Sequence, residues 1–286
     1  PTYAALAELC TLEAIVGIKT PLESFAAAKT AVRQAAELNC DSPEFFAARG
    51  FINLICDWNF QQAEENLRKS LKSNPRCATA NNYLGQVFMF QKRFAEAEFY
   101  LKRAAEIEPM GLYNRNMLAV AYFLARKFEK VVEECENNLQ VHPQYLVAAQ
   151  MRCWALEQIG RASEAVGVYE KILQNPHGEF ARRWIGYAYA LVGDRKNALD
   201  TVARLEAESA EHYVSPIHSA MIYSGLNEPD KACFFLEKAF SNRDPWLLWL
   251  VADARFDNLR DDARFIDLCI SKKTPSNIER RLFSLF

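Results

Sequence analysis

The chain has 286 residues, of which half are hydrophobic and 12% aromatic, a composition that supports a large core and excludes a disordered chain. Lysine and arginine total 34 against 36 aspartate and glutamate residues, so we expect no direct nucleic-acid binding by this fragment. The sequence lacks a run of roughly 18 apolar residues, and we expect no membrane association. The length favours two domains or one elongated architecture.

The chain begins Pro-Thr-Tyr, without an initiator methionine or a signal peptide, and we expect it to be part of a longer protein. The eight cysteines are scattered without a C-x-x-C pair, which favours reduced, buried thiols and a cytoplasmic protein. The four histidines lack metal-ligand spacing. We therefore expect no metal site and no cofactor.

The first predicted elements form an irregular pair of helices. The stretch YAALAELCTLEAIVGI, residues 3–18, has the pattern of one helix. Thr20-Pro21-Leu22-Glu23 then resembles a capping box, with proline at the first helical position of the second helix. This opening unit ends near residue 42.

Beyond it, a period close to 34 residues organises the chain. Prolines stand at 75, 109 and 143, and another follows at 176. Small or β-branched residues keep the same spacing: Ala28, Ala63, Ala97, Val131, Ala165, Ala198 and Ala232. A period held over six intervals indicates a repeat architecture.

Each unit has the pattern of two antiparallel helices. In the unit that begins at residue 78, Leu84 and Phe88 share one helix face, and Ala97 and Leu101 share another. The polar stretch QKR separates the two runs, and Pro109 ends the second. A glycine inside the first helix predicts close approach of the two backbones.

These positions resemble the tetratricopeptide repeat, which places small, aromatic and proline residues at fixed sites. Unit 78–111 matches the pattern with Gly85, Phe88, Ala97, Leu101, Ala104 and Pro109. The resemblance implies an all-α, right-handed superhelical solenoid of about seven helical hairpins over 1–246, with a C-terminal capping segment at 247–286. The units are expected at about 1–42, 43–77, 78–111, 112–145, 146–178, 179–212 and 213–246.

A narrower resemblance rests on three features: the long opening unit, the Asp57-Trp58 turn and the closing DARFDNLRDDARF. Together they resemble the tetratricopeptide region that follows winged-helix DNA-binding domains in bacterial transcription activators, including regulators of invasion genes. This resemblance implies a DNA-binding domain before Pro1. Similar regions also follow kinase and cyclase domains.

The closing stretch repeats D-A-R-F at 253–256 and 262–265. We expect two short helical turns, capped by Asp253 and Asp262, that dock aromatic rings on the open end of the last helix pair, with Trp246 and Trp249 nearby. The alternative is an exposed aromatic peptide site.

Common motifs of catalysis and nucleotide binding do not occur in the sequence. The sequence has no G-x-G-x-x-G, no Walker loop and no G-x-S-x-G. Acidic pairs such as Glu133-Glu134 stand at polar helix positions that a solvated face explains. We expect no catalytic residue and no enzyme activity.

The first helix of each unit is expected to line a concave groove that binds a protein or peptide partner. Amides there suit the N–H and C=O groups of an extended backbone, and aromatic side chains suit recognition surfaces. The alternative is tolerated polar residues and packing between helices. The predicted partner-binding residues are Asn82, Gln86, Phe90, Asn116, Phe123, Gln150, Trp154, Arg183 and Tyr187.

The sequence therefore predicts a protein–protein interaction or regulatory scaffold, with a sensory or oligomerisation role in a bacterial transcription regulator and with self-association as one mode of action. The alternative is an assembly adaptor, or the repeat region of a kinase- or cyclase-linked signalling protein.

Overall fold

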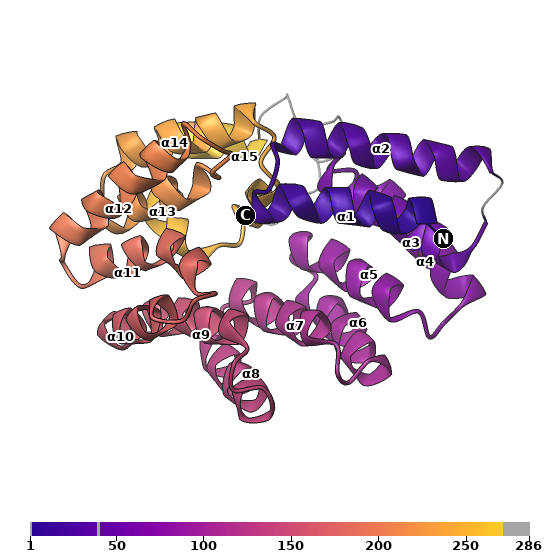
Figure 1. Cartoon of the computed structure of the whole chain (residues 1–286), viewed down its shortest axis with the longest axis horizontal. Helices are drawn as coiled ribbons and strands as arrows, with labels where there is room; N and C mark the ends of the chain where they lie inside the picture. Colours follow the sequence, from indigo (N-terminus) through magenta and orange to yellow (C-terminus); the bar gives the residue numbers. More distant parts are fainter. Residues whose placement is uncertain (1, 39–40, 271–286) are drawn as a thin grey trace. The chain divides into compact units, whose positions relative to one another are not determined.

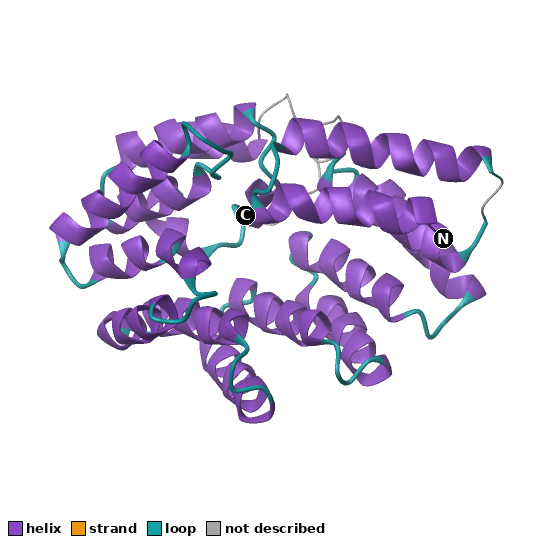
Figure 2. Ribbon diagram, viewed as in Figure 1, coloured by secondary structure: helices purple, strands orange, loops and turns teal. Residues whose placement is uncertain are grey.

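A computed structural model describes residues 2–38 and 41–270 of the chain. Within these residues the regular elements are all helices and none is a strand (Figure 2). The predicted all-α fold class is confirmed.

Helices follow one another in pairs along the sequence (Figure 1). The first eight are α1 (Thr2–Val16), α2 (Pro21–Glu37), α3 (Pro43–Ile55), α4 (Phe60–Ser73), α5 (Ala78–Phe90), α6 (Phe94–Ile107), α7 (Leu112–Leu124) and α8 (Phe128–Val141). The next are α9 (Leu146–Gln158), α10 (Ala162–Leu173), the 3-10 helix η1 (Glu179–Arg183), α11 (Ile185–Leu191), α12 (Arg195–Glu208), α13 (Ile217–Gly225) and α14 (Pro229–Ser241). Two further 3-10 helices and a last helix close the described chain: η2 (Pro245–Trp249), η3 (Ala254–Leu259) and α15 (Ala263–Ile270).

The chain divides into two compact units. Unit 1 comprises the described residues within 1–117, 241–251 and 267–270, and unit 2 comprises residues 118–240 and 252–266. The division falls inside α7, and the chain passes from unit 2 back to unit 1 and again to unit 2 near its end.

The start of α2 is fixed by the capping box that the sequence predicts. The Thr20 hydroxyl accepts a hydrogen bond from the Glu23 backbone N–H at 3.3 Å and donates one to the Glu23 carboxylate at 2.7 Å. Pro21 occupies the first turn of α2. A backbone N–H at this position would have no acceptor within the helix, so its absence in proline costs no hydrogen bond. In Figure 1, α1 and α2 then lie side by side in unit 1.

The turn between the two helices of a pair has a repeated backbone shape. One residue with positive φ recurs at spacings of 33 or 34 residues: Trp58, Lys92, Arg126, Gly160, Gly193 and Asn227. Glycine takes this left-handed conformation without strain, whereas other residues pay about 1 kcal/mol. The polar gaps predicted between helices are therefore tight left-handed turns.

Glycine inside a helix allows the paired helices to approach closely. A Cβ atom on Gly85 would lie 2.6 Å from the Leu101 Cγ atom of α6. Gly50 of α3 has the same relation to Leu67 of α4, also at 2.6 Å. The packing reason that the sequence predicted for Gly85 is thus confirmed.

The chain that follows α14 contributes to both units. The Trp246 indole N–H donates to the Ile15 carbonyl of α1, also in unit 1, at 3.1 Å, and the expected place of Trp246 beside the last helix pair stays a prediction. Phe256 and Phe265 are buried in unit 2, with ring centroids 6.3 Å apart. The remainder of the predicted capping segment, residues 271–286, lies outside the described residues.

Candidate functional site

The nine predicted partner-binding side chains differ in burial. Asn116 and Arg183 are half-buried. The other seven are buried: Asn82, Gln86, Phe90, Phe123, Gln150, Trp154 and Tyr187. Each unit gathers some of them into a network with neighbouring residues, and their role toward a partner stays a prediction.

In unit 1 the predicted amides bind one another and the start of α7. The Asn82 side chain donates to the Asn114 Oδ1 atom at 2.9 Å. Gln86 donates to the Asn82 Oδ1 atom at 2.7 Å and to the Tyr113 hydroxyl at 3.1 Å. Asn114 in turn donates to the Glu108 carboxylate at 3.2 Å. The hydrogen bonds from Asn82 and Gln86 to Asn114 and Tyr113 join α5 to α7. Each buried amide of the network has a polar partner, as buried polar groups require.

In unit 2 the structure brings two predicted residues together with a third that the sequence argument missed. The ring centroids of Phe123 and Trp154 lie 5.9 Å apart, and those of Trp154 and Trp184 lie 4.5 Å apart. We call Phe123, Trp154 and Trp184 the aromatic row. Its members come from α7, α9 and the junction of η1 with α11, so three successive helix pairs contribute one ring each.

One guanidinium group lies against all three rings. The Arg255 Cζ atom is 5.3 Å from the ring centroid of Phe123, 4.6 Å from that of Trp154 and 5.4 Å from that of Trp184. Aromatic faces attract a cation most strongly where water is excluded. The aromatic row is thus a binding surface for a guanidinium, and Arg255 of η3 occupies it.

The positive charge of Arg255 is balanced by Asp253. Arg255 Nε donates to Asp253 Oδ1 at 2.9 Å and Nη2 donates to Asp253 Oδ2 at 2.7 Å. The side chains are only 2% and 3% exposed, respectively. A buried charge is tolerated when a partner neutralises it and its hydrogen-bonding groups are satisfied. Asp253 also accepts a hydrogen bond from the Arg255 backbone N–H at 3.0 Å, as the predicted cap.

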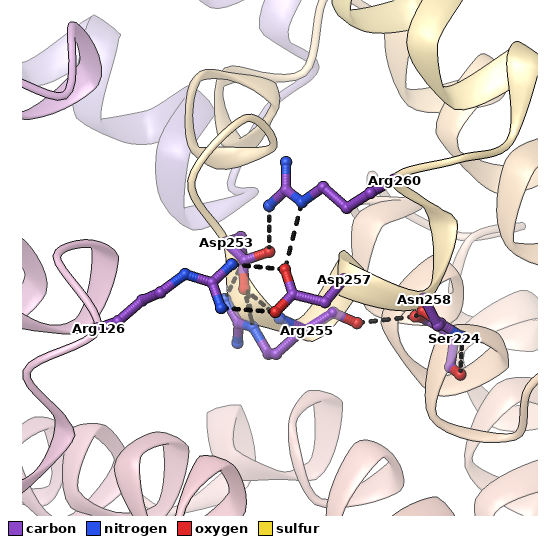
Figure 3. Close-up of polar contacts among 7 residues, drawn as sticks. All are labelled: Arg126, Ser224, Asp253, Arg255, Asp257, Asn258 and Arg260. Carbon is purple, nitrogen blue, oxygen red and sulfur yellow. Dashed lines mark hydrogen bonds and ion pairs between the residues drawn. The ribbon is translucent and has the colours of Figure 1, made fainter. Parts of the chain in front are cut away.

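Residues 253–260, which we call the inserted segment, are held by further polar contacts within unit 2 (Figure 3). The Ser224 hydroxyl of α13 donates to the Arg255 carbonyl at 2.7 Å, and the Asn258 side chain donates to the Ser224 carbonyl at 2.9 Å. At the other side, Arg126 binds Asp257 through two hydrogen bonds of 2.6 Å. The segment is therefore attached to α13 and to the turn after α7.

Two more titratable groups near Arg255 are uncharged at neutral pH. Burial raises the pKa of Glu157 to about 8, although Arg255 and a hydrogen bond from Tyr169 oppose the shift. Burial lowers the pKa of His218 to about 3, and its ring centroid lies 4.5 Å from that of Trp184. The Asp253–Arg255 pair is consequently neutral as a unit, and neither Glu157 nor His218 adds a charge to it at neutral pH.

The described part of the chain offers no group of three or more histidine, cysteine, aspartate or glutamate side chains that could hold a metal ion. The seven cysteines described are free thiols. Burial raises the pKa of Cys56 and of Cys135 to about 12, which leaves them weakly nucleophilic. Among the described helices, none has the length and apolar character to cross a membrane.

The sequence contained a signal for the residues that the prediction missed. D-A-R-F places an arginine two residues after an aspartate in an apolar stretch, and such an arginine needs a local counter-charge if it is buried. Trp184 is adjacent to the predicted Arg183 and carried no separate motif. The partner of Asp257 is 131 residues away in Arg126, a distance that local patterns do not bridge.

Comparison with known proteins supports the fold. Residues 78–109 match the family model described as tetratricopeptide repeat. A search of curated proteins found no match. A tetratricopeptide repeat protein from Parabacteroides merdae is similar in structure, with a TM-score of 0.56 and 13% identity over 87% of this chain and 98% of that one.

Two other solved structures are similar at lower scores. PilF from Pseudomonas aeruginosa has a TM-score of 0.49 and 19% identity over 72% of this chain and 93% of that chain. YrrB, described as a tetratricopeptide protein with an unusual peptide-binding site, has a TM-score of 0.40 and 16% identity over 77% of this chain and 96% of that chain. The family match at 78–109 and the Parabacteroides structure together show a fold of the tetratricopeptide type.

Proposed function

We propose that this chain is a non-catalytic scaffold that binds a short segment of a partner protein on the surface formed by the first helices of its repeats. One observation carries the proposal: unit 2 already holds a short segment of its own chain, residues 253–260, against that surface. Aromatic faces, a neutral ion pair and hydrogen bonds to backbone carbonyls make the contacts. These are interactions by which proteins commonly bind peptides.

The half-buried predicted residues are the positions at which a partner can be tested without disturbing the core. Asn116 of α7 is half-buried and therefore partly exposed to solvent. Truncating it to alanine is expected to leave stability within about 0.5 kcal/mol, because exposed polar residues rarely contribute more. If the amide pairs with a desolvated peptide backbone, partner binding should weaken by roughly 1–3 kcal/mol.

The test is a calorimetric titration with a partner that is captured from the source cells and then purified. Asn116→Ala is compared with Lys102→Ala, an exposed position on the second helix of a pair. The proposal expects a loss of affinity for Asn116→Ala only. Equal affinities for the two variants and the wild type would contradict it.

A finer proposal is that the scaffold is the sensory or oligomerisation part of a bacterial transcription regulator and acts in the cytoplasm. Its support is that the opening unit and the closing DARFDNLRDDARF resemble the tetratricopeptide region that follows winged-helix domains in bacterial transcription activators. The sequence encoded before Pro1 tests it: a winged-helix domain supports the proposal, and a kinase or cyclase domain contradicts it. Light scattering tests self-association, for which a monomer at all concentrations is the contrary result.

A further inference from the structure

The two D-A-R-F copies form the same local structure. In the second copy, Arg264 Nε donates to Asp262 Oδ1 at 3.0 Å, Nη2 donates to Oδ2 at 2.6 Å, and the Arg264 backbone N–H donates to Oδ1 at 2.9 Å. The same three donors of Arg255 bind Asp253 at 2.9, 2.7 and 3.0 Å. We call this arrangement the Asp–Arg fork.

The fork does not depend on burial. The Arg264 and Asp262 side chains are 43% and 19% exposed, whereas those of Arg255 and Asp253 are 2% and 3% exposed. An arrangement that forms in both environments is set by the local sequence. A short segment with aspartate two residues before arginine therefore carries its own counter-charge, and its guanidinium can enter an apolar surface as half of a neutral pair.

The aromatic row supplies that surface. Its three rings contact the guanidinium through their π systems, which are indifferent to the chain from which the arginine comes. Ser224 adds a donor to a backbone carbonyl, a group that every peptide has. The contacts at the row thus select a fork-bearing segment by chemistry and not by its position in this chain.

The outer end of the inserted segment is held at the surface. The Arg126 and Asp257 side chains that join it to the turn after α7 are 49% and 42% exposed. Arg126 has a φ of 60°, the left-handed conformation that glycine takes at the equivalent turn positions 160 and 193. Solvent weakens an exposed ion pair. We therefore expect the Arg126–Asp257 contact to break more readily than the buried Asp253–Arg255 fork.

We propose that the aromatic row is an arginine-recognition site, filled in the free protein by Arg255, and that it accepts the arginine of a partner segment with the pattern Asp-x-Arg-aromatic when that segment displaces residues 253–260. The inference rests on the proposed function and specifies the chemistry of the partner. The inserted segment then competes with the partner segment for the aromatic row. A tethered competitor acts at an effective concentration on the order of millimolar, so a free peptide binds the wild-type protein only weakly.

The experiment uses the full chain and a fluorescein-labelled peptide with the sequence of residues 251–261, VADARFDNLRD. A second peptide carries alanine in place of the arginine that corresponds to Arg255 and keeps the one that corresponds to Arg260. Fluorescence anisotropy measures both peptides on the wild type and on Arg255→Ala, which vacates the row. Circular dichroism checks that the variant is folded.

Arg126→Gly provides a second route if Arg255→Ala does not fold. Glycine suits this turn, so the substitution removes the outer contact without backbone strain. Lys92→Gly is its matched control, because Lys92 has a φ of 58° at the equivalent turn of unit 1.

The proposal expects the peptide to bind Arg255→Ala at least about tenfold more tightly than it binds the wild type, and the alanine peptide to lose at least about tenfold on that variant. Arg126→Gly should fall between wild type and Arg255→Ala, while Lys92→Gly should match the wild type. The proposal is overturned if folded Arg255→Ala binds neither peptide or binds both equally. If only Arg126→Gly folds, affinities equal to those of Lys92→Gly overturn it.

These outcomes are separable from those of the proposed function. Failure of the peptide to bind, with partner affinity still sensitive to Asn116→Ala, removes the arginine site and leaves the scaffold role. Peptide binding at the row, with a partner indifferent to Asn116→Ala, supports the arginine site and removes the predicted amide contact.

Discussion

Substitution of Arg255 by methionine tests whether the buried fork is a balanced charge pair. Methionine keeps a long apolar side chain against the aromatic row but removes the cation. Asp253, whose side chain is 3% exposed, then loses its counter-charge in the interior. Removal of one partner of a buried ion pair costs about 3–5 kcal/mol, chiefly because the other charge stays buried and uncompensated. We expect Arg255→Met to destabilise unit 2 by that amount.

The double variant Asp253→Asn with Arg255→Met separates the charge from the packing. Asparagine retains a side-chain oxygen that can accept the backbone N–H of residue 255, so the cap of η3 is preserved. With both charges gone, no uncompensated charge remains. We expect the double variant to lie within about 1–2 kcal/mol of the wild type, and hence to be more stable than Arg255→Met alone.

The assay is urea unfolding at pH 7, followed both by circular dichroism and by tryptophan fluorescence, because two units need not unfold together. The Asp253→Asn single variant completes the double-mutant cycle. If the double variant is as unstable as Arg255→Met, the loss arises from packing of the side chain and not from a stranded charge, and the reasoning is refuted.

Further predictions concern other parts of the molecule. Glu157→Gln should flatten the fall in stability that the wild type shows as pH rises from about 5 to 8, because the folded-state pKa of about 8 exceeds the ordinary 4.5 and the stabilisation is lost as the carboxyl ionises. Asn82→Ala should cost about 1–3 kcal/mol, since it removes the buried hydrogen bonds that Asn82 makes with Asn114 and Gln86, whereas Asn116→Ala should cost no more than about 0.5 kcal/mol. Gly85→Ala should cost about 1–3 kcal/mol by overpacking α5 against α6, and Gly167→Ala, with open space around its Cβ, should stabilise α10 by about 0.5–1 kcal/mol.

Chemical denaturation checks each of these predictions. Parallel pH profiles for Glu157→Gln and the wild type would count against the buried neutral carboxyl. Equal losses for the two asparagine variants would mean that the amide network contributes nothing measurable. A stabilising Gly85→Ala would show that the contact between the helices can relax.

The helix pairs were predictable because their cause is local and repeated. Apolar residues recur at helical spacing within each repeat, and small residues and prolines stand at the same positions in successive repeats. The capping box at Thr20 and the close packing at Gly85 followed from the same kind of local rule. The left-handed turns were also within reach, since Gly160 and Gly193 stand at two of them.

The occupied site was not predictable in the same way. Family positions indicated that Phe123 and Trp154 would belong to the helix surface, but they gave no sign of what lies on them. That depends on contacts between segments far apart in sequence, such as Arg126 with Asp257. The pattern of charges along a sequence predicts that an arginine lies at the surface. Arg255 is buried instead, because the Asp–Arg fork supplies its counter-charge locally.

The central claim is that Arg255 lies in the aromatic row, and nuclear magnetic resonance of arginine Nε–Hε groups tests it most directly. With arginine-selective labelling and assignment by Arg255→Lys, we predict a signal shifted by the ring currents of Phe123, Trp154 and Trp184 and protected from exchange with water by burial and by Asp253. A signal at the position of an exposed arginine, exchanging freely with solvent, would contradict the account.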